Sequence, residues 1–158
     1  MARTRGPSRR DLVGGASLGV ALLATGVKTA HAQASSDESF EQAERAILSG
    51  RTPKAAGVEI VMPQLSENGN SVDITVTVAS PMTAEDHVRR VHILAEKNPF
   101  PRVATFHLTP RAGRAEVSTR MRLATTQEIV VIAETSRGEL LRAQREMIVI
   151  LGACVDGG

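Results

Sequence analysis

The chain has 158 residues, a formal net charge of +2, one cysteine, three phenylalanines and no tyrosine or tryptophan. That length suits a single domain with a core of ordinary size. One cysteine excludes an intramolecular disulfide framework and a cysteine-rich metal site. An aromatic content of 2% argues against proteins that stack bases or sugars on exposed rings.

The first 32 residues have the features of an export signal. They carry five basic residues and one acid, and residues 12–27 are apolar and rich in glycine. These 16 residues are fewer than the roughly 20 that a membrane-spanning helix needs. The Ala-His-Ala sequence at 30–32 fits a signal peptidase, so we expect cleavage after Ala32. Arg9 and Arg10 form the adjacent pair of a twin-arginine signal; the alternative is an ordinary secretory signal whose arginines adjoin by chance.

Removal of this signal reverses the net charge. After residue 32 the chain has 14 basic and 16 acidic residues, which gives the mature protein a net charge of −2. Binding to nucleic acid then lacks its electrostatic basis. We expect an exported, periplasmic protein that begins near Gln33.

Residues 33–57 are expected to form a short helix and a linker. Ser39 and Gln42 match a capping box, and Gly50 suits the position just after a helix, which predicts a helix over 35–50. Pro53 lies in the linker that follows.

After residue 57 the hydrophobic period changes from 3.6 to 2, which predicts a mostly β domain over 58–151. We expect seven short strands, with Asn68-Gly69 as a hairpin turn between the first two. Such strands favour an immunoglobulin-like antiparallel β-sandwich over a small barrel. The predicted strands are 58–65, 72–78, 88–95, 103–108, 115–123, 129–135 and 141–151.

The only cysteine, Cys154, follows the last predicted strand. Residues 152–158 contain Gly152, Ala153, Gly157 and Gly158 and too few apolar residues for another strand, so we expect a flexible C-terminal arm. An unpaired thiol in an oxidising compartment suggests that Cys154 carries a covalent group. From Gly152 the sulfur would reach about 10 Å. An intermolecular disulfide or an inert thiol are the alternatives.

Other candidate residues are weaker. His92 and His107 lie on predicted strands and His87 precedes one, and their spacing does not favour a metal site. Glu85-Asp86 is better explained as a solvated turn than as a catalytic pair. Four arginines are predicted to gather around one hairpin, where an anion or partner surface and a solvated sheet edge are equally good explanations. They are Arg111, Arg114, Arg120 and Arg122.

Several stretches together resemble the SoxY family, sulfur-carrying subunits of the periplasmic thiosulfate-oxidising system. They are the twin-arginine signal, the predicted helix at 40–48, Glu67-Asn68-Gly69-Asn70-Ser71-Val72, Ser80-Pro81-Met82-Thr83, His92-Ile93, Ala95-Glu96-Lys97-Asn98-Pro99, Phe106-His107, Thr109-Pro110-Arg111 and Val117-Ser118-Thr119-Arg120. The family typically ends in Gly-Gly-Cys-Gly-Gly. This chain differs there by having Ala153, Val155 and Asp156 around Cys154.

The resemblance implies an immunoglobulin-like sandwich that pairs with a SoxZ-like subunit and carries sulfur on Cys154. A haem-containing enzyme would join thiosulfate to the thiol, a hydrolase would release sulfate, and a sulfur dehydrogenase would oxidise the remaining sulfur. The chain would then be a substrate carrier that holds no cofactor, and not an enzyme. Two other functions compete: an interaction module whose tail cysteine forms an intermolecular disulfide, and a cysteine hydrolase that uses His92 or His107.

Overall fold

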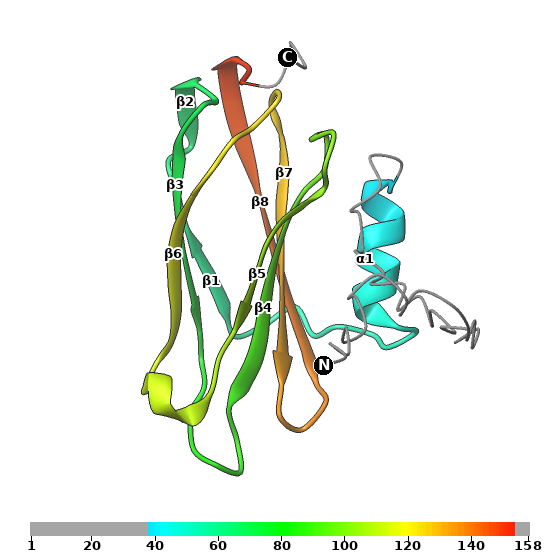
Figure 1. Ribbon diagram of the computed structural model, residues 1–158, viewed down its shortest axis with the longest axis vertical. Coiled ribbons are helices and arrows are strands. Elements are labelled where there is room, and N and C mark those ends of the chain that lie inside the picture. Colours follow the sequence, from blue (N-terminus) through cyan, green and yellow to red (C-terminus); the bar gives the residue numbers. More distant parts are fainter. Residues whose placement is uncertain (1–37, 154–158) are drawn as a thin grey trace, which may run out of the picture. The chain divides into compact units, whose positions relative to one another are not determined.

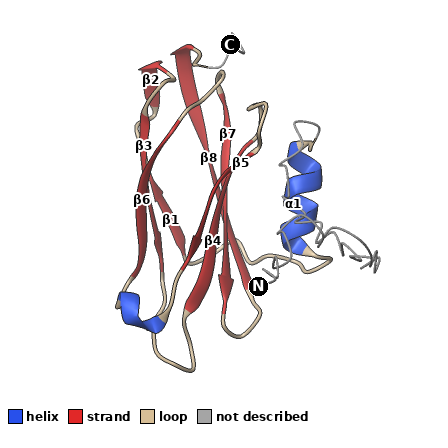
Figure 2. Cartoon of the chain, viewed as in Figure 1, coloured by secondary structure: helices blue, strands red, loops and turns tan. Residues whose placement is uncertain are grey.

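The computed structural model describes residues 38–153. These residues fold into two β-sheets and one α-helix (Figures 1 and 2). The elements are α1 (Phe40–Leu48), β1 (Val58–Val61), β2 (Leu65–Asn68), β3 (Val72–Val78), β4 (Val88–Ala95), β5 (Arg102–His107), the 3-10 helix η1 (Pro110–Ala112), β6 (Ala115–Met121), β7 (Gln127–Thr135) and β8 (Leu140–Leu151). No helix among these is long and apolar enough to cross a bilayer.

The strands form a sandwich of a three-stranded sheet, in the order β1-β3-β6, and a five-stranded sheet, in the order β2-β8-β7-β4-β5. The chain passes from one sheet to the other at five connections and stays within the five-stranded sheet between β4 and β5 and between β7 and β8. This arrangement confirms the predicted sandwich and excludes the barrel. The named strands pair antiparallel, except that β2 runs parallel to β8.

The first predicted strand, 58–65, is wrong as a single element. Pro63 interrupts it, because proline cannot donate a ladder hydrogen bond. β1 pairs with β3 in one sheet, whereas β2 pairs with β8 in the other. Eight strands therefore replace the seven expected. Asn68-Gly69 is not a hairpin turn, since β2 and β3, on either side of it, lie in different sheets.

The core lies between the two sheets. The inward side chains of β3 alternate strictly with outward ones, as its sequence predicts. β7 instead is buried on both faces, because α1 packs on its outer side (Figure 1). Ala43 and Ile47 of the helix contact Leu94, Val130 and Ile132 of the sheet.

Helix α1 is shorter than the helix predicted over 35–50. Residues 35–37 of that prediction lie outside the described part of the chain. Ser39 is the N-cap: its hydroxyl accepts from the Gln42 amide while the Gln42 side chain accepts from the Ser39 amide, which confirms the capping box. Ser49 and Gly50 both have positive φ, at 48° and 75°, and end the helix. In the linker, Lys54 hydrogen-bonds through its backbone to β8.

Candidate functional site

The described structure ends at Ala153, so several predicted functional residues lie outside it. These are Arg9, Arg10, the cleavage position Ala32, Cys154, Gly157 and Gly158. The structure does show where the segment that bears Cys154 leaves the sandwich, at the end of β8 (Figure 1).

The last residues of β8 are held from both sides. β7 pairs with β8 as far as the Gln127–Met147 register. Beyond it, the Thr126 hydroxyl accepts from the Val149 amide at 3.0 Å and donates to the Val149 carbonyl at 3.3 Å. On the opposite side, β2 pairs in parallel with β8 as far as Leu151.

Ala153, which was expected to belong to a flexible arm, is hydrogen-bonded to the sandwich. Its amide donates to the Leu123 carbonyl at 3.0 Å. Gly152 is exposed, and Ala153 is half-buried. The backbone of the described arm is therefore held one residue before Cys154, because a buried carbonyl keeps an available donor as its partner.

The loop that carries Leu123 is itself supported by two amide side chains. Asn98 donates to the Arg122 carbonyl at 2.8 Å and accepts from the Ala124 amide at 3.0 Å. Gln127, only 1% exposed, donates to Asn98 at 2.9 Å and to the Thr125 carbonyl at 3.1 Å.

The sequence predicts no role for Gln127 or Thr126. A glutamine just before the apolar run of β7 was the available signal, since a buried amide needs polar partners. Those partners come from loops that lie far apart in sequence.

The three candidate histidines do not form one cluster: His92 and His107 are diagonal neighbours on β4 and β5, and His87 lies apart from them. His92 lies on β4 under α1, with Nδ1 3.0 Å from the Thr105 hydroxyl. His107 is exposed on β5, and His87 lies before β4 with Nδ1 3.0 Å from the Thr83 carbonyl. Residues 38–153 contain no group of three or more His, Cys, Asp or Glu side chains placed to hold a metal ion.

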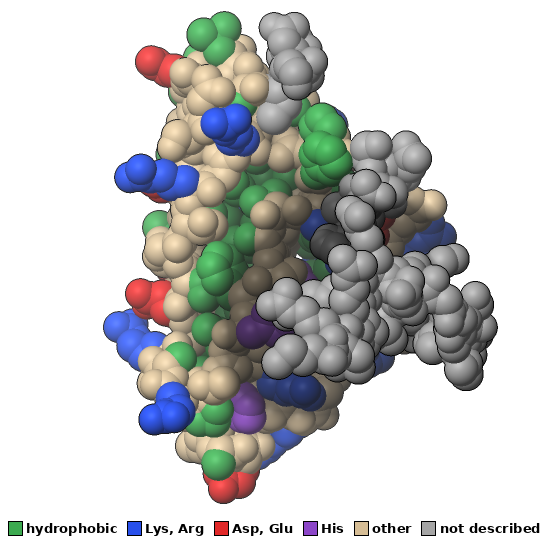
Figure 3. All heavy atoms as spheres, viewed as in Figure 1, with side chains coloured by type: hydrophobic (Ala, Val, Ile, Leu, Met, Phe, Trp, Pro, Cys, Tyr) green, Lys and Arg blue, Asp and Glu red, His purple; other side chains and the backbone are tan. Residues whose placement is uncertain are grey.

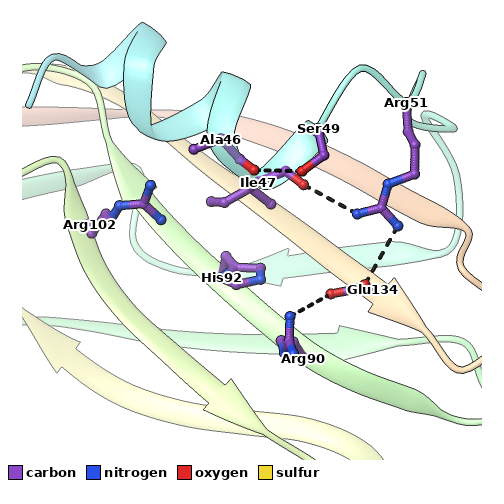
Figure 4. A pocket seen from close by; sticks show the side chains of 8 residues that line it. All are labelled: Ala46, Ile47, Ser49, Arg51, Arg90, His92, Arg102 and Glu134. Carbon is purple, nitrogen blue, oxygen red and sulfur yellow. Dashed lines mark hydrogen bonds and ion pairs between the residues drawn. The ribbon is translucent and has the colours of Figure 1, made fainter.

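His92 lines a cavity of about 280 Å³ between α1 and the sheet (Figure 4). Glu134 bridges Arg51 and Arg90 there, at 3.5 Å and 3.2 Å. Arg102 lies at the other side of the ring and forms a bidentate pair with Glu38. Burial holds the pKa of His92 below its ordinary value. The three arginines that line this cavity, Arg51, Arg90 and Arg102, are all engaged in ion pairs with glutamates.

This cavity is remote from the end of β8. His92 is in register with Ile132 on β7, five residues along that strand from Gln127. At about 3.3 Å per residue, the His92 row lies roughly 17 Å from the last row of the β7–β8 pairing. The geometry therefore does not support a catalytic pair between Cys154 and His92, and His107 is farther still, since it pairs with Arg90.

The four arginines do not gather around one hairpin. Arg111 lies in η1 and Arg114 just before β6. Arg120 lies near the other end of β6 and Arg122 just beyond it, about 20 Å away along the strand. Arg114 pairs with Glu116, and Arg120 pairs with Asp73. Figure 3 shows basic side chains spread along the β6 side of the molecule. The expected arginine cluster is thus wrong, because residues at the two ends of an extended strand are far apart.

Glu85-Asp86 forms a surface turn, as expected. The Asp86 amide donates to the Thr83 hydroxyl at 3.1 Å, and its carboxylate pairs with Arg137 at 3.5 Å. The Asp86 carboxylate is thus accounted for by an ion pair, without a catalytic role.

Comparison with known proteins assigns the chain to a family. The model of the sulfur oxidation protein SoxY matches residues 44–154, most of the chain. The chain belongs to the SoxY family. The structure of the SoxY sulfur carrier protein from Chlorobium limicola f thiosulfatophilum resembles this SoxY-family chain with 34% sequence identity and a TM-score of 0.57, and the match covers 70% of this chain and 98% of the Chlorobium one.

More distant structures share only the fold. A superoxide reductase (neelaredoxin) from Ignicoccus hospitalis matches with 18% identity and a TM-score of 0.53, over 69% of this SoxY-family chain and 91% of its own. A putative superoxide reductase from Thermotoga maritima matches with 19% identity and a TM-score of 0.52, over 61% and 87%. A search of curated proteins finds no match.

Proposed function

We propose that this protein is a periplasmic sulfur carrier that holds thiosulfate-derived sulfur on Cys154. The observation that carries the proposal is membership of the SoxY family, which includes a solved sulfur carrier protein at 34% identity. The family match extends to residue 154, the position of the only cysteine in the chain. The function then lies in presenting one thiol to other proteins.

The chemistry of the thiol follows from its partners. A haem-containing enzyme joins thiosulfate to the Cys154 sulfur, which forms a sulfur–sulfur bond, releases the thiol proton and passes two electrons to the haem protein. A hydrolase then adds water to the terminal sulfonate, so that sulfate leaves and a persulfide remains on Cys154. A sulfur dehydrogenase takes electrons from the outer sulfur as water supplies its oxygens, and a second hydrolysis releases sulfate and restores the thiol.

A SoxZ-like subunit is the proposed permanent partner. Of the large hydrophobic side chains exposed on the described residues, four lie on β2 and β8, next to the segment that bears Cys154. They are Leu65, Ile148, Ile150 and Leu151, with exposures of 47%, 39%, 62% and 66%. Apolar side chains grouped on a surface in this way are typical of protein interfaces. We call this group the β8 patch.

The surface beside the β8 patch is acidic. Glu128 and Glu146 are cross-strand neighbours on β7 and β8, and neither forms an ion pair within residues 38–153. A partner with an apolar centre and a basic rim fits such a surface.

Intact-mass measurement of the protein isolated from cells that oxidise thiosulfate tests the proposed function. We expect adducts whose masses correspond to one sulfur atom or to a thiosulfonate group, removable by reductant and absent from Cys154→Ser. Fully free thiol during growth on thiosulfate would contradict the proposal. A stable covalent dimer in non-reducing electrophoresis as the active species would favour the disulfide-linked interaction module instead.

A further inference from the structure

Three loops that are far apart in sequence meet where β8 ends. Gly69 follows β2, Leu123 follows β6, and Ala153 follows β8. Their backbones form a relay of hydrogen bonds: the Gly69 amide donates to the Leu151 carbonyl at 2.7 Å, the Leu123 amide to the Gly69 carbonyl at 2.9 Å, and the Ala153 amide to the Leu123 carbonyl at 3.0 Å. We call this relay the backbone clasp.

The clasp depends on the absence of a side chain at Gly69. This residue is buried, and a Cβ added to it would lie 2.3 Å from the Leu123 carbonyl oxygen and 3.2 Å from the Ala153 amide nitrogen. Gly69 is not among the residues with positive φ, so the requirement is one of space and not of backbone angle. Any larger residue must separate the loops that Gly69 joins.

The contacts around the clasp leave little room for such a shift. The Leu123 side chain is fully buried in the core between the sheets. Asn98 holds the backbone on both sides of Leu123, through Arg122 and Ala124. On the Gly69 side, the Asn68 carboxamide oxygen accepts from the Asn70 amide at 2.9 Å and closes the turn. The side chains of Asn68 and Asn98 thus support the clasp on its two sides.

We infer that Gly69 is a positioning residue for Cys154: the backbone clasp fixes the point from which the carrier cysteine leaves the sandwich. This role for Gly69 rests on the proposed function, in which Cys154 carries sulfur. With Ala153 held, the Cys154 sulfur can lie no farther than about 7 Å from the Ala153 Cα, because one peptide unit and a short side chain separate the two atoms. This reach is shorter than that expected of an arm that begins at Gly152.

A short reach restricts how other enzymes approach. An enzyme that acts on the sulfur must dock on the end of the sandwich formed by the turn after β2, the loop after β6 and the end of β8, which lie at the same end of the molecule in Figure 1. Holding the cysteine near one place also lowers the entropy lost when its adduct enters an active site.

The test uses Cys154 itself, because the chain has no other cysteine to label. A nitroxide spin label is attached to Cys154 of the purified mature protein, and its mobility is read from the electron paramagnetic resonance line shape. Gly69→Ala should separate the loops. Ala153→Pro removes the amide hydrogen that bonds to Leu123 and leaves Gly69 unchanged. Ala153→Ser is its matched control, because it keeps the donor.

We expect the label to move several-fold faster in Gly69→Ala and in Ala153→Pro than in the wild type and Ala153→Ser. Hydrogen exchange should show the Ala153 amide at least tenfold protected in the wild type and unprotected in Gly69→Ala. If Gly69→Ala does not fold, Ala153→Pro decides, since Ala153 lies outside the core. Equal label mobility in Ala153→Pro and Ala153→Ser, or an unprotected Ala153 amide in the wild type, would overturn the inference.

These measurements involve no sulfur substrate. Failure of the clasp therefore leaves the proposed function standing, and a protein that carries no sulfur in cells could still show the clasp. The intact-mass experiment on Cys154 and the mobility experiment thus fail independently.

Discussion

At the scale of single residues, His92 shows how burial sets a protonation state. The pKa of His92 is lowered first by desolvation under α1, and the nearby charges of Arg90, Arg102 and His107 lower it further. Glu134 opposes them, because its negative charge favours the imidazolium. The folded protein therefore keeps His92 neutral at a pH at which the unfolded chain binds a proton.

This difference predicts a pH dependence of stability. Below an ordinary histidine pKa of about 6.5, the unfolded chain takes up a proton that the folded chain does not, so the free energy of unfolding falls as the pH decreases. We would measure urea unfolding from about pH 7.5 to about pH 5.5, roughly one unit on either side of that pKa. Over this range the free energy of unfolding should fall less steeply for His92→Gln than for the wild type. The difference in slope is at most about 1.4 kcal/mol per pH unit. Parallel slopes for the two proteins would mean that His92 titrates normally in the fold.

At the scale of elements, α1 combines a local signal with long-range contacts. Its capping box is formed by Ser39 and Gln42. Its position on the sheet depends on Ala43 and Ile47 and on two ion pairs to strands, Glu38 with Arg102 and Glu44 with Arg142. The cap therefore stabilises the helix, whereas contacts with the sheet determine its position.

Ser39→Ala should lower the free energy of unfolding by about 1 kcal/mol, because the Gln42 amide loses its acceptor. Ser39→Thr keeps a hydroxyl and should cost much less. Both variants are compared by urea unfolding at neutral pH. An equal loss in the two variants would show that the contribution of Ser39 does not come from its hydroxyl.

At the scale of the whole molecule, the β8 patch predicts how the protein assembles. Ile150→Glu should weaken co-purification of the SoxZ-like subunit at least tenfold, an estimate from the usual effect of burying an unpaired charge. The isolated chain should keep its melting temperature, since Ile150 is 62% exposed. Phe100→Glu changes a comparably exposed side chain away from β2 and β8 and serves as the control. Unaltered pairing in Ile150→Glu would place the interface on another surface.

Export makes a second prediction at this scale. Replacement of Arg9 and Arg10 together by lysine should retain the precursor in the cytoplasm, because the twin-arginine route requires the arginine pair. Arg5→Lys is the matched control, since it keeps that pair. Fractionation and immunoblotting measure the distribution. Normal export of the double variant would assign the signal to the general secretory route.

Short-range patterns in the sequence were enough to predict the sandwich. The alternation in Val72–Val78 and the capping box at Ser39 are both visible in the structure, because each depends on neighbours within a few residues. The sequence also shows that its basic excess lies in residues 1–32, since residues 33–158 carry a net charge of −2, and it identifies the single cysteine as the residue to explain.

Tertiary structure alone decided which distant segments meet. Pro63 marks the break between β1 and β2 locally, but their assignment to different sheets depends on distant strands. The burial of His92 and the contact of Gly69 with Leu123 and Ala153 likewise depend on segments far apart in sequence, and the separation of the arginines depends on the length of β6. Such contacts arise from packing and from the satisfaction of buried backbone groups, which one sequence does not encode in any local pattern. The sequence thus identified the cysteine, and the fold determined where the backbone just before it is held.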